Sequence, residues 1–235
     1  MQYMYVPSPY SIFKDIYKLD PGCILEIDSI GAMQSPKQIT SFTFNSKGVG
    51  IKQWYSLSDI VKNSQNNLIT DENEAVELLE ETLLKSVQSQ LISDVPLGAF
   101  LSGGVDSSTI VALMSNECSH PVKTFTIGFE ESAFNEAVYA KDVAKHLETD
   151  HHELYITAND ALKVIPSLPS LYDEPFADSS QIPTYLVSKL ARKNVTVSLS
   201  GDAGDELFGG YNRYLWGKQV WGKLKWMPLI MRQVL

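Results

Sequence analysis

Residues 95–114 are VPLGAFLSGGVDSSTIVALM, and this stretch decides the fold. Residues 95–101 are an apolar run typical of a short strand, and residues 107–114 have the pattern of a helix. Residues 101–108, which join the two, contain two glycines, three serines and Asp106. A tight turn with Asp106 as a helix cap is the simpler interpretation. However, glycines let backbone N–H groups turn toward an anion, and a helix N-terminus favours negative charge, so the loop is also suited to phosphate.

Strands and helices alternate along most of the chain after residue 70. Asp71 and Glu74 form a capping pair that predicts the start of the first helix. Helices are expected at residues 71–91, 107–114, 135–147, 160–168 and 184–192, and strands at residues 95–101, 122–128, 153–156 and 195–199. This order is typical of an α/β fold, in which helices cover both faces of a parallel sheet. Ligands bind such sheets at the carboxyl ends of the strands.

A second loop with candidate functional residues follows the last predicted strand. Residues 199–211 are LSGDAGDELFGGY, so Asp202, Asp205 and Glu206 fall within five residues. Like charges this close are costly unless a cation or another partner compensates them. The loop is therefore either a site for a metal or a metal-bound polyphosphate, or a solvated acidic turn with a helix cap near Asp205.

The first 70 residues differ from the rest because they are poor in helical patterns. Strands are expected at residues 23–27, after a Pro-Gly turn, and at residues 41–44. Residues 45–70 are polar with little periodicity, and residues 56–70 are interpreted as a linker or surface segment. The predicted division is thus residues 1–55, a linker at 56–70, and residues 71–235.

Composition argues against several classes of protein. The 28 acidic residues outnumber the 19 basic ones, and the net charge of −9 does not favour nucleic-acid binding. No apolar run approaches the roughly 20 residues that span a bilayer, and no signal peptide is apparent. Cys23 and Cys118 have neither disulfide nor zinc spacing. We therefore expect a cytoplasmic protein without nucleic-acid or membrane partners.

Four segments together resemble the glutamine-hydrolysing asparagine synthetase family. Residues 102–108 match the SGGxDS motif of the PP-loop ATP-pyrophosphatase superfamily, and residues 200–211 are similar to the family's SG[ED]GxDE[LV]FGGY segment. Residues 173–185 resemble the family's substrate segment, and residues 5–23 the end of its glutaminase domain. The resemblance implies the adenine nucleotide alpha hydrolase-like fold. It makes residues 1–55 the tail of a class II amidotransferase domain, and residues 71–235 the first part of the ATP-binding domain.

The resemblance also implies roles for individual residues. ATP and its pyrophosphate are expected at Leu101, Ser102, Gly103, Gly104, Asp106, Ser107, Ile127, Ser200 and Gly201. Adenine would meet the backbone of Leu101, Ile127 and Gly201. The expected metal ligands, for Mg²⁺ with pyrophosphate, are Asp106 and Asp205. Asp202 would be the catalytic residue tied to formation of β-aspartyl-AMP, and the amino-acid substrate is associated with Asp173, Asp178 and Ser179.

The function implied is ATP-dependent amidation of aspartate to asparagine through β-aspartyl-AMP, with ammonia from glutamine. The expected partners are these small-molecule substrates, with a homodimer as an open alternative. A second hypothesis keeps the fold but changes the acceptor, as in sugar amidotransferases of polysaccharide biosynthesis or β-lactam synthetases. A third is a non-catalytic fragment that binds nucleotide or associates with a complete partner.

Three features depart from the family pattern. The residue after Met1 is Gln2, where family glutaminases have a cysteine nucleophile, and the chain ends at Leu235, before the family's later helices and a catalytic lysine. We therefore expect a fragment or a truncated chain without glutaminase activity. Ala203 replaces the family's usual glycine, and would be strained by about 1 kcal/mol or more if that position needs a positive φ.

Overall fold

The computed structural model describes residues 4–33, 43–46, 48–130 and 135–228. Contacts divide the chain into two compact units. Unit 1 comprises Met1–Leu78 and Asn159–Ile182, and unit 2 comprises Leu79–Ala158 and Pro183–Leu235. Each unit is built around its own sheet, and each is described by itself below.

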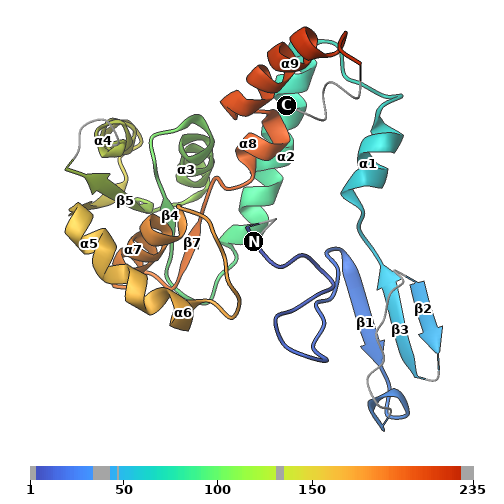
Figure 1. Cartoon of the computed structure of the whole chain (residues 1–235). Helices are drawn as coiled ribbons and strands as arrows, with labels where there is room; N and C mark the ends of the chain where they lie inside the picture. Colours follow the sequence, from blue (N-terminus) through green and yellow to red (C-terminus); the bar gives the residue numbers. More distant parts are fainter. Residues whose placement is uncertain (1–3, 34–42, 47, 131–134, 229–235) are drawn as a thin grey trace. The chain divides into compact units, whose positions relative to one another are not determined.

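Unit 2 is organised by a four-stranded parallel sheet (Figure 1). Its strands are β4 (Leu97–Phe100), β5 (Lys123–Phe129), β6 (Asp150–Ile156) and β7 (Val197–Leu199). Their order across the sheet is β6-β5-β4-β7, so β4 is an internal strand although it is the first of these four along the chain. Leu97 of β4 pairs with Val197 of β7, and Gly98 pairs with Lys123 of β5. The last strand in sequence is therefore the neighbour of the first.

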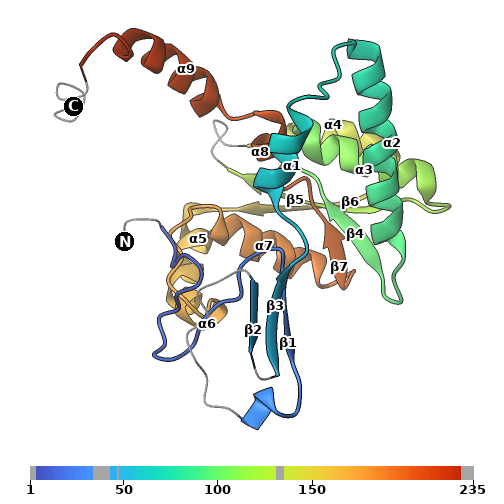
Figure 2. The same ribbon diagram turned by 90° about the vertical axis from the view of Figure 1, so that its right-hand side faces the viewer.

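Helices cover both faces of this sheet (Figure 2). The helices of unit 2 are α2 (Glu72–Leu91, from residue 79 on), α3 (Val105–Glu117), α4 (Ala137–His146), α7 (Gln181–Ala191, from residue 183 on), α8 (Gly204–Phe208) and α9 (Asn212–Leu224). Ala99 and Leu101 pack with α2, α3 and α4 in one buried cluster. Phe100, between them in sequence, packs on the opposite face against the cluster of Phe125 with α7. The predicted α/β class, with a parallel sheet between helices, is confirmed.

Most predicted elements of the sheet region are present, with shifted ends. Glu74 donates its N–H to Asp71 Oδ1 over 2.9 Å, so the predicted cap of α2 is confirmed. The single helix expected at residues 160–168 is wrong, because the chain there forms α5 (Ala158–Val164), a 3₁₀ turn (Ile165–Ser167) and α6 (Leu168–Leu171). Pro166 and Pro169 lack the N–H that a continuous helix needs. No helix among the described residues is long and apolar enough to cross a membrane.

Unit 1 contains an antiparallel sheet that the sequence predicted only in part. Its strands are β1 (Cys23–Ile27), β2 (Thr43–Ser46) and β3 (Val49–Gln53), in the order β1-β3-β2, and a 3₁₀ turn (Gly31–Met33) follows β1. β1 is confirmed, and β2 overlaps the strand expected at residues 41–44, of which residues 41 and 42 lie outside the described residues. The central strand β3 was missed because its sequence, VGIKQ, lacks a clear alternation. Gly48, with φ +85°, forms the turn that leads into it.

The segment interpreted as a linker contains a helix. α1 (Leu57–Ser64) begins after Ser56, whose Oγ accepts a hydrogen bond from the N–H of Asp59 over 3.3 Å. The sequence did contain a signal for this helix, because Leu57, Ile60 and Val61 lie one helical turn apart after the Ser56 cap, and the interpretation as a linker or surface segment did not use it. Cys23 and Cys118 are both free, in agreement with the absence of a disulfide pattern.

Within unit 1, the N-terminal segment is tied to the segment that resembles a substrate-binding region. Lys18 forms an ion pair with Glu174, and the N–H of Ile12 donates to Glu174 Oε1 over 3.2 Å. The N–H of Ala177 donates to the carbonyl of Met4 over 2.8 Å. The hydrogen bond from Lys18 lowers the pKa of Glu174, and the N–H of Ile12 adds to this shift. Ionised Glu174 therefore stabilises the contact between the two segments.

This contact should weaken in acid. A carboxylate with a lowered pKa in the folded state stabilises above its ordinary pKa of about 4.3, and the stabilisation is lost as the pH falls through the folded-state pKa. We expect hydrogen-exchange protection of the Ile12 and Ala177 amides to fall over that range, and Glu174→Gln to show the same low protection at neutral pH. Glu77→Gln, at an exposed carboxylate of α2, is the control and should change nothing. Unchanged protection in Glu174→Gln would refute the role of the ion pair.

Candidate active site

The pairing of β4 with β7 brings the two predicted loops together. Each loop begins at the carboxyl end of its strand, and the strands are parallel neighbours. A methyl group on Gly201 would lie 2.7 Å from the backbone N of Ser107 and 2.9 Å from the carbonyl carbon of Asp106. One on Gly204 would collide with the Asp106 carboxylate. The second loop is therefore in direct contact with the start of α3. A side chain at position 201 would require the backbone to move, and one at position 204 would displace the Asp106 carboxylate.

The first loop is held in shape by serine hydroxyls. Buried Ser107 accepts a hydrogen bond from the N–H of Ser102 over 3.2 Å, and their hydroxyls lie 2.9 Å apart. Ser107 Oγ also donates to the carbonyl of Gly104 over 3.3 Å. Gly103 has φ +80° and packs against α4, where a methyl group would lie 2.6 Å from the N of Ala140. Ser107 thus maintains the loop, while Ser102 is exposed.

The start of α3 has the properties of an anion site. Its N-cap is Gly104, so no side chain accepts hydrogen bonds from the first turn. A methyl group on Gly104 would contact only Ser102 Oγ, at 3.3 Å, which leaves space beside the backbone. Ser108 Oγ is buried without a hydrogen-bond partner. Free N–H groups, an unused hydroxyl and a helix N-terminus together fit the oxygens of a phosphate.

Of the three positions expected to face adenine, Leu101 directly follows β4 and Ile127 lies within β5, and both strands are internal. Leu101 is buried; its N–H donates to the carbonyl of Phe125 over 3.0 Å, and its carbonyl accepts a hydrogen bond from Thr126 Oγ1. Its backbone groups are therefore already used, apart from the second lone pair of the carbonyl oxygen. Ile127 is partly buried in β5, opposite Leu154 of β6. Contact of either residue with adenine stays a prediction.

The carboxylates of the second loop have hydroxyl partners. Ser200 Oγ donates to Asp202 Oδ2 over 3.0 Å, and Tyr211 Oη donates to Glu206 Oε1 over 2.8 Å. The hydrogen bond to Glu206 raises the pKa of Tyr211, because it stabilises the protonated phenol. Asp205 is half-buried, whereas Asp202 and Glu206 are exposed. These bonds lower the repulsion that the sequence predicted within the loop.

The two expected magnesium ligands differ in what the structure shows of them. The Asp106 carboxylate lies against Gly204 at the contact between the two loops, whereas Asp205 Oδ1 lies beside Gly210. Across the described ranges, no group of three or more His, Cys, Asp or Glu side chains is arranged to hold a metal. Mg²⁺ is commonly held by one or two carboxylates together with substrate phosphates, and the Asp106 carboxylate beside a phosphate-suited loop fits that chemistry. A role of Asp205 as a second ligand stays a prediction.

Gly204 was not predicted as part of the candidate site, and Ser108 was expected only as one of three serine donors in the first loop. The signal for Gly204 was its place between two acidic residues of a loop, where a glycine points to a close approach. Ser108 follows Ser107 in the motif. Only the structure shows that the Ser107 hydroxyl is hydrogen-bonded within the loop, whereas the Ser108 hydroxyl has no partner.

The residues associated with the amino-acid substrate belong to unit 1, whereas both loops belong to unit 2. Asp173 and Ser179 are exposed, and Asp178 Oδ1 accepts a hydrogen bond from the N–H of Ser180 over 2.8 Å. That bond lowers the pKa of Asp178. The role of all three toward the substrate stays a prediction.

Comparison with protein families identifies the chain. Residues 78–234, more than half of it, match the family model described as asparagine synthase. The chain belongs to the asparagine synthase family. Among its relatives, a putative asparagine synthetase [glutamine-hydrolyzing] 2 of Methanocaldococcus jannaschii is 37% identical over 231 residues, which cover 98% of this chain and 40% of that protein. Asparagine synthetase [glutamine-hydrolyzing] 1 of Bacillus subtilis is 35% identical over 214 residues, 91% of this chain and 30% of that protein. The chain thus spans less than half the length of these two family members.

Solved structures resemble the chain only loosely. The NMN synthetase from Francisella tularensis is 15% identical, with a TM-score of 0.40 over 61% of this chain and 60% of its own. The assignment to the asparagine synthase family therefore depends on sequence.

Ala203, at the start of α8, adopts the left-handed conformation with φ +72°. The strain predicted for alanine at this position is thus present. We expect Ala203→Gly to raise the free energy of unfolding by about 0.5–1 kcal/mol, because relief of a cost of about 1–2 kcal/mol exceeds the extra unfolded-state entropy of glycine. Urea unfolding measures the change. Ala112→Gly, inside α3, is the control and should lose about 1 kcal/mol. A loss in Ala203→Gly would contradict the left-handed assignment.

Proposed function

We propose that the chain binds ATP with Mg²⁺ at the two loops of unit 2. There it activates the side-chain carboxylate of aspartate as β-aspartyl-AMP, which ammonia derived from glutamine converts to asparagine. The observation that supports this most is the contact of Gly201 and Gly204 with the start of α3, in a member of the asparagine synthase family. The names of the relatives support aspartate as the acceptor and glutamine as the source of nitrogen.

The first loop binds the pyrophosphate portion of ATP. The N–H groups in the first turn of α3 donate to its oxygens, and exposed Ser102 lies beside them in the loop. Ser107 holds these donors in place, so they need no rearrangement as negative charge grows on the leaving group. Preorganised donors of this kind lower the barrier to cleavage between the α- and β-phosphates.

Asp106 and Asp205 hold the metal. A bound Mg²⁺ would neutralise charge on the pyrophosphate as it leaves. Asp202, exposed and hydrogen-bonded to Ser200, serves the adenylation step. Because a carboxylate is a poor electrophile, ammonia can displace AMP only after this step. Ammonia is a nucleophile only when unprotonated, so a sheltered route from the glutamine site follows from the same chemistry.

Binding of Mg·ATP tests the first part of the proposal. Calorimetry should detect binding to the 235-residue chain, and Asp106→Ala should weaken it by more than about tenfold, because one of two metal-binding carboxylates is lost. Asp142→Ala removes an exposed carboxylate of α4 and should bind as the parent does. Equal affinity in the parent and in Asp106→Ala would rule out this loop as the nucleotide site.

The two aspartates of the second loop should have separable roles. Asp205→Asn is expected to shift the Mg²⁺ dependence of ATP binding, whereas Asp202→Asn should spare binding and abolish aspartate-dependent exchange of pyrophosphate into ATP. A chain of the relatives' full length serves as the reference for exchange. Exchange supported by a sugar acid instead of aspartate would favour the other acceptor hypothesis. Parent-level exchange in Asp202→Asn would contradict the role assigned to Asp202.

A further inference from the structure

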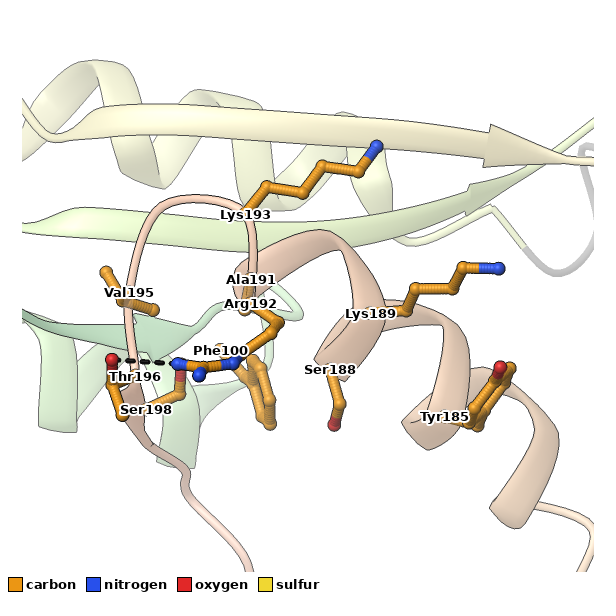
Figure 3. Close-up of a pocket in the computed structure, with 10 residues that line it drawn as sticks. All are labelled: Phe100, Tyr185, Ser188, Lys189, Ala191, Arg192, Lys193, Val195, Thr196 and Ser198. Carbon is orange, nitrogen blue, oxygen red and sulfur yellow. Dashed lines mark hydrogen bonds between the residues drawn. The ribbon is translucent and has the colours of Figure 1, made fainter. Parts of the chain in front are cut away.

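A hollow of about 780 Å³ lies between α7 and the strands β4 and β7. It is lined by Phe100, Tyr185, Ser188, Lys189, Ala191, Arg192, Lys193, Val195, Thr196 and Ser198 (Figure 3). None of these residues belongs to either nucleotide loop, and all belong to unit 2. The hollow is therefore separate from the site described above, although the two strands that line it also lead into the two loops.

The base of this α7 pocket is apolar. Ala191 and Val195 are buried, and they belong with Phe125 to the core cluster on this face of the sheet. The ring of Phe100 packs against the same cluster. The hydroxyls of Ser188 and Ser198 complete the lining. Such a surface accepts an apolar group and still offers polar partners at its edge.

Three cations gather around the same pocket. Arg192 donates from Nη1 to Thr196 Oγ1 over 2.8 Å, which holds the guanidinium beside the opening (Figure 3). Lys189 and Lys193 flank it on the same helix and the turn after it, with Lys189 Nζ 5.9 Å from the ring centre of Tyr185. The lining contains no acidic residue.

The charge around the pocket is uncompensated. Within the described part of the chain, none of the three cations forms an ion pair with a carboxylate. Cations near a helix C-terminus stabilise the helix through its dipole, and this alone could explain their presence. The dipole does not, however, explain the apolar recess that the same residues line. A guanidinium presents a planar set of donors that matches two oxygens of an anion.

We propose that the α7 pocket binds a small organic anion with an apolar body. The apolar body lies on Phe100, Ala191 and Val195, and the anionic oxygens face Arg192. A small molecule is favoured over a macromolecule because the volume falls within the roughly 300–1,000 Å³ of ligand pockets. The net charge of −9 argues against nucleic acid as the occupant.

Two matched probes, naphthylacetate and its uncharged amide, test the proposal. Titration of the chain followed by backbone amide shifts should give saturating changes centred on the pocket residues for naphthylacetate. The amide should bind about tenfold more weakly or worse, because it lacks the anionic oxygens. Affinity for the carboxylate should also fall as salt is added.

Charge-removing variants locate the anion. Arg192→Gln should weaken naphthylacetate binding by about tenfold, and Lys189→Gln should weaken it by a smaller factor without disturbing the bond to Thr196. Lys145→Gln, at an exposed position of α4, removes the same charge elsewhere and should bind as the parent does.

Three results would overturn the proposal. They are equal binding of the carboxylate and the amide, shifts centred outside the pocket, and full affinity in both Arg192→Gln and Lys189→Gln. Binding of an acidic amphipathic peptide at these residues, without binding of naphthylacetate, would likewise overturn it and assign the surface to a protein partner.

Discussion

The parallel pairing of β4 with β7 is the constraint on which the candidate site depends. It places Val197 beside Leu97, and the loops that leave the two strands then meet at one edge of the sheet. A shift of this register would separate Gly201 from Ser107 and Gly204 from Asp106. The start of α3 and the second loop would then no longer be in contact. The pairing of β4 with β7 therefore also brings together the two loops of the candidate site.

The composition of β4 makes this pairing possible. Gly98 leaves no room for a side chain, because a methyl group would lie 2.7 Å from the carbonyl oxygen of Lys123 and 2.8 Å from the ring of Phe125. Ala99 is fully buried against α3 and its neighbours, whereas Phe100 turns to the opposite face. Small residues let both neighbouring strands and both helical layers approach the central strand. The same strand then ends directly in the phosphate-suited loop.

The sequence predicted the sheet and its two loops because their signals are local and strong. An apolar run followed by SGGVDSS predicts β4, the loop and α3 from adjacent residues. β3 was not predicted, because VGIKQ has no distinct period and depends on its partner strands. The local signal for α1, in which Leu57 lies one helical turn from Ile60 and Val61, was overlooked. The contact of Gly204 with Asp106 and the internal bonds of Leu101 are also tertiary, since they join segments that only the strand order brings together.

The late position of β7 in the chain has a consequence for folding. β5 and β6 follow β4 closely, so these three strands can pair while the chain is still being synthesised, whereas Leu97 waits for a partner about a hundred residues later. Until that partner arrives, β4 has an open edge, which is a template for pairing with other chains. Before β7 pairs with β4, the polypeptide is therefore prone to aggregation. This stage ends when β7, followed by the acidic loop, takes its place beside β4.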